Sequence, residues 1–236
     1  MPTLTHEQKR QIVARLPLFS GLAEVDHDAI ARAAQSSVLE ARRELFHKGD
    51  VAAEVYIVVH GRLKAFATSP EGNDVVFSIL GPGDMIGEIA LLGETERTAT
   101  IVAIDACQLL AIGRPEFRAF LESHPGAAIA LLQVLARRIA RLSELVEDTQ
   151  FLNLPVRLAK KILELAESYG KQTPDGLRVE LRLSQEEWGD LVGATRESVN
   201  KQLRTWTKEG YLSVEDRRVI IHRIDALERL ADAVAV

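Results

Sequence analysis

Residues 184–209 read SQEEWGDLVGATRESVNKQLRTWTKE. Ser184 is followed three residues later by Glu187, which is the pattern of a capping box and predicts the start of a helix. That helix is predicted to end near Gly193, and Thr195 offers a second hydroxyl cap for the helix that follows. Two helices joined by a turn that contains glycine are typical of a helix-turn-helix.

The residues after this motif predict two short strands around a charged turn. Tyr211–Val214 and Val219–His222 are the predicted strands, and residues 215–218 between them read EDRR. A helix-turn-helix followed by such a hairpin is a winged helix-turn-helix.

One polar face runs along the second helix of the motif. Arg196, Asn200 and Arg204 repeat every four residues, and Glu197 and Lys201 repeat beside them. An arginine can donate twice to guanine and a glutamate can accept from cytosine, and in this motif the N-terminal residues of the second helix enter the major groove. We therefore expect Arg196 and Glu197 to read bases, with Lys201 as a second reader.

Thr195, Arg204 and the wing residues Arg217 and Arg218 are expected to contact phosphates. The full candidate DNA-binding set is Ser184, Thr195, Arg196, Glu197, Asn200, Lys201, Arg204, Arg217 and Arg218. The alternative is a solvated helix face, since Glu197 and Lys201 also have the spacing of an intrahelical ion pair.

The first half of the chain has a different pattern. Residues 5–14 and 25–34 predict short helices, and residues 37–112 form short β-branched and aromatic runs separated by glycine and proline turns. Many short strands with such turns predict an antiparallel sandwich or barrel. The expected fold class is therefore α+β, with a β jelly roll, a long helix and a C-terminal winged helix-turn-helix.

A long helix is predicted over residues 127–149, after a short one at 116–122. Apolar side chains recur along it at alternating spacings of three and four, as in a two-helix coiled coil. The predicted dimer seam consists of Leu132, Leu135, Ile139, Leu142, Val146 and Thr149. The alternative is a helix that packs on its own β-sandwich.

The segment after the long helix predicts a new domain. Asn153 is a candidate N-cap for a helix over 154–169, with Pro155 in its first turn. Residues 170–176 predict a loop, and alternating leucines and valine predict a strand over 177–183. The expected domains are 1–115 for an effector, 116–152 for the dimerisation helix and 153–236 for DNA binding.

A candidate anion site lies in the first half. Gly87 permits close backbone approach, and residues 88–92 can form a helical turn with free N–H groups. Arg97 presents a planar fork for two phosphate oxygens, Thr98 adds a hydroxyl, and Glu88 can accept a hydrogen bond from a ribose hydroxyl. This set suits a cyclic nucleotide; the alternative is a turn glycine beside a structural Glu88–Arg97 ion pair.

These motifs resemble the Crp–Fnr superfamily of bacterial transcription regulators. The resemblance runs from residues 18–22 (LFSGL) to the wing. The phosphate-binding pattern GE(x8)RTA matches at Gly87, Glu88 and residues 97–99, the long helix matches at residues 136–138 (ARR) and Ser143, and the recognition helix matches at residues 196–197 (RE).

The resemblance implies a homodimer that binds a cyclic nucleotide, cAMP in the type member, and a two-fold symmetric double-stranded DNA operator, with RNA polymerase as a further partner. Glu88 would bind the ribose, and Arg97 and Thr98 the phosphate. Arg138 and Ser143 would close the pocket, with Ser143 coming from the same or the other subunit. The implied ligand-binding set is Gly87, Glu88, Ile89, Arg97, Thr98, Ala99, Arg138, Leu142 and Ser143.

Two positions depart from the type member. Leu142 stands where that protein has a threonine that meets the adenine, so another effector, such as cyclic di-GMP, or none, is the alternative function. Lys201 stands where it has an arginine, and a lysine donates as a point charge instead of a fork. The cysteine clusters of the family's iron–sulfur branch are missing.

Composition narrows the remaining classes. The chain has 236 residues, 47% of them apolar, a net charge of −5 and a single cysteine, Cys107. One cysteine cannot form an internal disulfide or a four-cysteine zinc site. The six histidines are scattered and no catalytic arrangement stands out, so we expect no enzyme and no covalent cofactor. Neither a membrane-spanning run nor a secretory signal is visible, which predicts a cytoplasmic protein.

Overall fold

The computed structural model describes residues 3–16, 18–19, 21–93 and 95–233. Ser20, part of the LFSGL stretch, lies outside them. The chain divides into two compact units, Met1–Ile139 and Ala140–Val236, and the division falls inside one long helix.

Two four-stranded sheets form the centre of the first unit, and all of their strand pairs are antiparallel. The strand orders are β1-β8-β3-β6 and β2-β7-β4-β5. The strands are β1 (Gln35–Leu39), β2 (Glu44–Phe46), β3 (Glu54–His60), β4 (Leu63–Thr68), β5 (Asp74–Leu80), β6 (Met85–Ile86), β7 (Thr100–Ala103) and β8 (Cys107–Gly113).

Strand β8 shows why the first unit has two cores. Successive side chains of a strand point to opposite faces, and almost all of β8 is buried. Cys107 and Leu109 belong to a cluster with side chains from both sheets, whereas Leu110 and Ile112 belong to a cluster with the helices. The predicted β-sandwich is confirmed, with one of its sheets covered by helices on the outer face.

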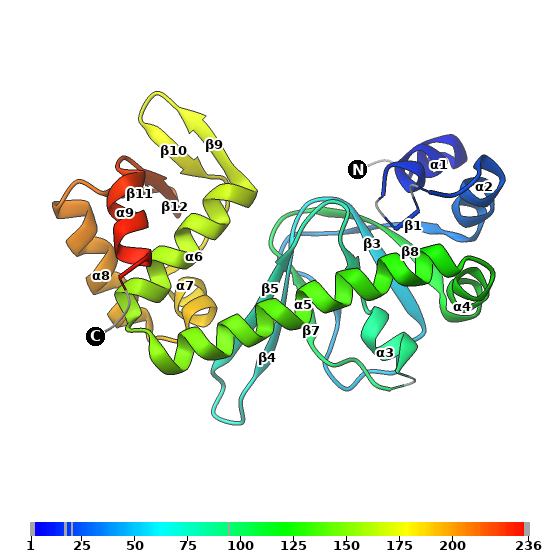
Figure 1. The fold of residues 1–236 in the computed structure, drawn as a ribbon, viewed down its shortest axis with the longest axis horizontal. Helices are drawn as coiled ribbons and strands as arrows, with labels where there is room; N and C mark the ends of the chain where they lie inside the picture. Colours follow the sequence, from blue (N-terminus) through cyan, green and yellow to red (C-terminus); the bar gives the residue numbers. More distant parts are fainter. Residues whose placement is uncertain (1–2, 17, 20, 94, 234–236) are drawn as a thin grey trace. The chain divides into compact units, whose positions relative to one another are not determined.

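Four shorter helices accompany this sandwich (Figure 1). They are α1 (His6–Arg15), α2 (Glu24–Ala33), α3 (Glu88–Leu92) and α4 (Arg114–Ser123). The two N-terminal helices lie within two residues of the predicted bounds.

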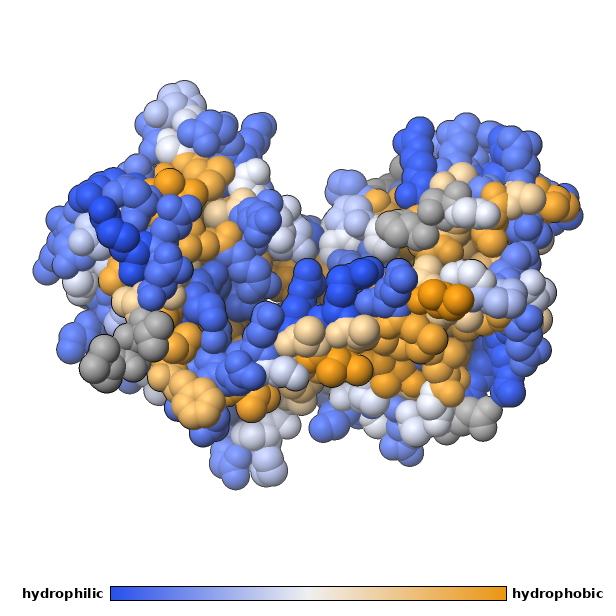
Figure 2. Space-filling view, in the orientation of Figure 1, coloured by the Kyte–Doolittle hydropathy of each residue, from blue (hydrophilic) through white to orange (hydrophobic). Residues whose placement is uncertain are grey.

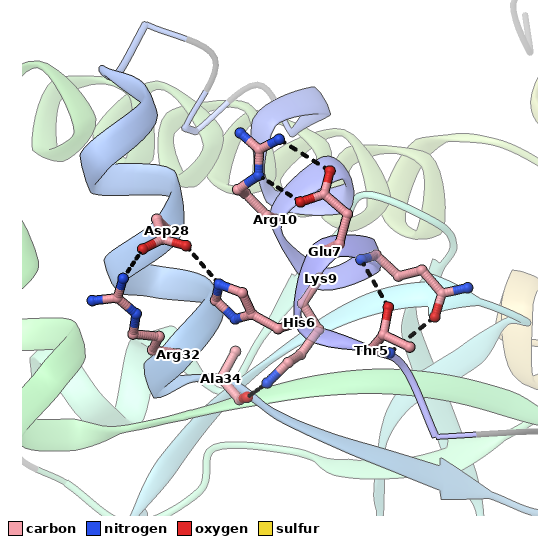
Figure 3. A network of polar contacts seen from close by, with 9 residues as sticks. Thr5, His6, Glu7, Lys9, Arg10, Asp28, Arg32 and Ala34 are labelled. Carbon is pink, nitrogen blue, oxygen red and sulfur yellow. Dashed lines mark hydrogen bonds and ion pairs between the residues drawn. The ribbon is translucent and has the colours of Figure 1, made fainter.

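Polar side chains join α1 to α2 (Figure 3). His6 Nε2 lies 2.5 Å from Asp28 Oδ1, and Lys9 donates to the carbonyl of Ala34 over 2.6 Å. Asp28 also pairs with Arg32, one turn further along α2. The hydrogen bond from His6 lowers the pKa of Asp28.

Helix α5 (Pro125–Phe151) is the predicted long helix, and it extends two residues beyond each predicted end. Ala127 and Leu131 are buried, and Leu135 packs against the cluster between the helices and the first sheet. The N-terminal part of α5 therefore packs on its own sandwich, as in the alternative interpretation of its apolar pattern.

The second unit contains one sheet and four further helices. The sheet has the order β11-β12-β10-β9. The elements are α6 (Leu154–Tyr169), β9 (Gly170–Thr173), β10 (Gly176–Val179), α7 (Gln185–Val192), α8 (Arg196–Lys208), β11 (Leu212–Glu215), β12 (Arg218–Ile221) and α9 (Ile224–Ala231). Asn153 caps α6 by accepting from Val156 N over 3.2 Å, as predicted.

The segment after α6 is predicted wrongly. Residues 170–173 form a strand that pairs antiparallel with β10, instead of a loop, and β10 ends at Val179, not at residue 183. Leu181 and Leu183 are buried outside any strand. The alternation of apolar residues therefore reflects which side chains are buried. It continues beyond Val179, where the hydrogen-bonded strand β10 ends.

Candidate functional site

The predicted anion site is a loop and a helical turn between two strands of the sandwich. Strand β6 ends at Ile86, Gly87 follows in the left-handed conformation with φ of 87°, and α3 begins at Glu88. A Cβ added at Gly87 would lie 2.1 Å from Nη1 of Arg97. Both the backbone angle and this close approach require glycine.

Arg97 is held deep in this site, with 4% of its surface exposed. Its Nη2 donates to the carbonyl of Glu54 over 2.7 Å, and its Nη1 donates to the carbonyl of Gly87 over 3.1 Å. The Nε of Arg97 is buried and has no hydrogen-bond partner among the described residues. Burial lowers the pKa of Arg97, and nearby Tyr56, Glu54, Asp50 and Glu88 oppose that shift.

Two aromatic rings lie beside the Arg97 guanidinium. The centre of the Phe46 ring is 4.0 Å from its central carbon, and that of Tyr56 is 5.8 Å away. The Tyr56 hydroxyl donates to Glu54 Oε2 over 2.8 Å, and burial, reinforced by Glu54, raises the pKa of Tyr56 to about 12. The rings fix the plane of the guanidinium.

Sequence reasoning missed Phe46, Glu54 and Tyr56. Glu54 contributes a backbone carbonyl, which leaves no signal in the residue type. The two aromatic residues belong to ordinary strand patterns. Only the folded structure brings them to Arg97.

Glu88 is buried, with 1% of its surface exposed, and it pairs with Nη1 of Arg138 on α5. Nη2 of Arg138 donates to the carbonyl of Met85 over 2.6 Å. The predicted residues Glu88 and Arg138 therefore lie together. In the described part of the chain, the ion pair of Glu88 is with Arg138 and not with Arg97, which overturns the alternative interpretation of this motif.

The other predicted ligand residues are more open. Ile89 and Thr98 are exposed, and Ala99 packs against the core between the sheets. Leu142 and Ser143 are exposed on the part of α5 that belongs to the second unit.

The predicted dimer seam leaves a row of apolar side chains exposed along α5 (Figure 2). The exposed fractions are 63% for Leu132, 65% for Ile139, 42% for Leu142 and 62% for Val146. Leu135 packs inward, and the Thr149 hydroxyl donates to the carbonyl of Leu145 over 2.7 Å. A row of large exposed apolar side chains on one helix is typical of an interface.

The helix-turn-helix in the second unit has the predicted caps. Ser184 and Glu187 form the capping box, and the Thr195 hydroxyl accepts from Ser198 N. Gly193 ends α7 with φ of 63° in the left-handed conformation. A Cβ added at Gly189 would lie 2.4 Å from the carbonyl oxygen of Ala194, so a glycine is needed where the helices approach.

Helix α8 has a buried face and an exposed one. Val199, Leu203 and Trp206 are buried. The exposed residues include the candidate base readers Arg196, Glu197 and Lys201, and Arg204, a candidate phosphate contact. In the described residues, Glu197 and Lys201 do not form an ion pair with each other, so all four side chains point to solvent with their polar groups available.

Asn200 and Arg218 already have protein partners. Asn200 Nδ2 donates to Oε1 of Gln185 over 2.6 Å and so joins α8 to α7. Arg218 pairs with Glu180 and Asp216, whereas Arg217 is exposed at the tip of the wing with φ of 60°. Arg217 is thus better placed than Arg218 for a new contact.

No single helix within the described ranges has the length and apolar character needed to cross a membrane. Helices α4 and α5, which are bent by 111° at their junction, reach that length and composition only when they are counted together. The same residues contain no group of three or more His, Cys, Asp or Glu side chains arranged to hold a metal ion.

Comparison with known proteins matches both parts of the chain. Residues 37–124 match the cyclic nucleotide-binding domain family, and residues 156–230 match the Crp-like helix-turn-helix domain family. A CRP-like cAMP-activated global transcriptional regulator of Mycobacterium tuberculosis is 32% identical over 221 residues, which are 94% of this chain and 99% of that protein.

Solved structures with a similar fold include members of the same family. A CRP-family transcriptional regulator from Thermus thermophilus is 26% identical with a TM-score of 0.73, over 84% of this chain and 97% of that one. The c-di-GMP responsive global regulator CLP of Xanthomonas campestris shares the fold, with a TM-score of 0.75 at 21% identity, over 85% of this chain and 99% of that one.

The two domains together define a class of protein, a DNA-binding transcription regulator that carries a cyclic nucleotide-binding domain. Within that class, the chain belongs to the Crp–Fnr family.

Proposed function

We propose that this regulator is a homodimer that binds cAMP in its N-terminal sandwich and then a two-fold symmetric DNA operator. The observation that carries the proposal is the buried Nε of Arg97, which has no acceptor among the residues the structure describes. An unpartnered charged donor in the interior is costly, and an anionic oxygen would satisfy it. A transcriptional role also places RNA polymerase among the proposed partners and the bacterial cytoplasm as the compartment.

The proposed ligand contacts follow from the chemistry of the site. The Arg97 fork and the Thr98 hydroxyl would bind the cyclic phosphate, with backbone N–H groups of residues 87–89 and 99 beside them. Glu88 would accept from the ribose hydroxyl. Glu88 is paired with Arg138 of α5. A ribose bound at this carboxylate would therefore change the contact between Glu88 and α5.

Dimerisation is proposed through the exposed row on α5. Leucine, isoleucine and valine at coiled-coil spacing bury their apolar surface when a second helix packs against them. Two parallel copies of α5 would hold two copies of α8, and a two-fold pair of recognition helices suits half-sites about one helical turn apart.

Calorimetry on the nucleotide-free protein tests the effector. We expect cAMP to bind with close to one molecule per subunit, with cGMP and cyclic di-GMP run as competitors of the same chemistry. Absence of heat with cAMP would reject it as the effector. Binding of cyclic di-GMP in its place would support the alternative function.

That alternative is a regulator of the same fold with another effector, or with none. Leu142 favours it, because an aliphatic side chain cannot hydrogen-bond the edge of an adenine base. Leu142→Thr distinguishes the two: a gain in cAMP affinity over the wild type would show that Leu142 weakens adenine binding.

A further inference from the structure

A pocket of about 300 Å³ lies between α2 and α4 of the first unit. Small side chains on both helices leave the space: Ala29 and Ala33 are one turn apart on α2, and Ala119 and Ser123 are one turn apart on α4. None of the cassette residues 87–89 or 97–99 lines it. The pocket is therefore separate from the proposed nucleotide site.

Aromatic rings form much of its wall. Phe19, Phe117 and Phe120 line the pocket, and Phe19 meets Phe120 edge to face with ring centres 5.3 Å apart. Phe19 and Phe117 are each 1% exposed, so the floor belongs to the packed core and is preformed. Aromatic faces attract organic cations as well as apolar groups.

The charges at the pocket are acidic. Among the described lining residues, Asp26 and Glu116 are the carboxylates, and there is neither lysine nor arginine. His124 is the single basic group of that set, stacked on Phe120 with ring centres 4.7 Å apart, and its Nε2 lies 3.3 Å from Asp26 Oδ1. Even with His124 charged, one negative charge is left over, so a cation is favoured over an anion.

We propose that this pocket binds a small organic ammonium compound, with its aryl or short alkyl part against the three phenylalanines and its charged nitrogen at Asp26 and Glu116. The volume is at the lower end of that of small-molecule sites, which restricts the occupant to a compact molecule. The phenylalanines would bind the apolar part of the compound and the carboxylates its charge. Both interactions together are needed to favour organic ammonium compounds over other small molecules.

The pocket shares core packing with other parts of the first unit. Phe117 belongs to the same core cluster as Leu91 of α3 and Leu131 of α5. The ligand would therefore contact a side chain in the core that also holds the helix of the cassette and the long helix. The proposal does not depend on which nucleotide, if any, binds at Arg97.

Phenethylamine is the probe, and 3-phenylpropanoate is its matched control with the opposite charge. We expect phenethylamine to bind the full-length protein at least about tenfold more tightly than the control, which corresponds to ~1.4 kcal/mol. Amide NMR shifts in the labelled protein should locate the binding at Ala29, Ala119 and His124. Equal affinity of the two compounds, or shifts that map elsewhere, would overturn the proposal.

Three variants sharpen the test. Ala29→Phe places a ring at the mouth of the pocket, where Ala29 itself is exposed, and should abolish binding. Glu116→Gln should weaken phenethylamine at least about threefold and leave the control compound unchanged. Glu122→Gln, also on α4 but outside the lining, should have no effect. An amide NMR spectrum that is unaltered away from the pocket shows that the fold of Ala29→Phe survives, and unaltered phenethylamine binding by Ala29→Phe would contradict the assignment.

Discussion

Arg97 is the side chain on which the proposed nucleotide binding mainly depends. Its two Nη groups are bound to backbone carbonyls, its plane is set by Phe46, and its Nε is left for a ligand. A charge that is positioned by the fold before ligand arrives loses little freedom on binding.

Replacing this arginine should therefore abolish tight nucleotide binding. We expect Arg97→Ala to weaken cAMP by about 2–5 kcal/mol, as for truncation of one partner of a buried charge pair. Arg97→Lys should recover only part of the loss, because lysine lacks the fork. Calorimetry gives the affinities. Arg43→Ala, at an exposed arginine of the same unit, is the control, and unchanged affinity in Arg97→Ala would refute the phosphate role.

Cys107 gives a pH prediction at the scale of a residue. Burial is the largest cause that raises the pKa of its thiol, from 9.0 to about 11. The unfolded chain therefore loses the thiol proton at lower pH than the folded protein does, so this contribution to stability is lost as pH rises from 9 to 11.

The measurement is the denaturation midpoint in that pH window. It should fall further with rising pH in the wild type than in Cys107→Ala. Because Cys107 is the sole cysteine of the sequence, a thiol reagent reports on it alone and should react quickly only with the unfolded protein. Rapid labelling of the folded protein would contradict its burial.

At the scale of elements, we propose that α8 separates base reading from phosphate binding along one helix. Arg196 is at its first position and Arg204 is two turns later. We expect Arg196→Ala to weaken binding to a selected operator by about 1–3 kcal/mol and to relax the choice at one base pair. Arg204→Ala should weaken operator and random DNA alike and reduce the slope of the salt dependence by about one. If Arg196→Ala behaved like Arg204→Ala, it would be a phosphate contact.

The exposed row on α5 predicts how the dimer is broken. Ile139→Glu would place an unpaired charge in the proposed interface, at a cost of about 3–5 kcal/mol, and should shift the protein to monomers in analytical ultracentrifugation. Gln133→Glu adds the same charge to the same helix outside the predicted seam, and should leave the assembly unchanged. Equal behaviour of the two variants would exclude this seam.

Local signals explain which elements the sequence predicts well. Helix α6 is found at its predicted bounds because Asn153 and Pro155 mark its start. Strand β9 is missed because residues 170–173 (GKQT) are neither apolar nor alternating, and their extended conformation comes from pairing with β10. The cap and turn residues of the helix-turn-helix act within a few residues, so sequence alone reveals them.

Contacts between distant residues follow a different rule. The Glu88–Arg138 pair joins positions 50 residues apart, and the sequence predicts their common site only through family resemblance. The carbonyl of Glu54, the ring of Phe46 and the Gln185–Asn200 contact depend on tertiary packing and leave no pattern in the sequence. At the scale of the site, the sequence predicts the charged groups and not what orients them.

For the whole molecule, the proposed function requires that nucleotide and operator each change the affinity for the other. Such coupling is reciprocal, so cAMP should tighten operator binding by the same factor by which operator tightens cAMP binding. A factor of about 5–150 is typical of allosteric proteins. Both factors are measurable, by operator titration with and without cAMP and by cAMP titration with and without operator.

The Glu88–Arg138 pair connects the cassette to α5, and its removal tests the route of the coupling. In Arg138→Ala both factors should shrink together toward one, beyond any loss of cAMP affinity, because α5 is no longer paired with Glu88, the carboxylate proposed to bind the ribose. Arg141→Ala, one turn further along α5, should keep the wild-type factors. A variant Arg138→Ala that binds cAMP more weakly but keeps the full coupling would show that the signal reaches the DNA-binding unit by another path.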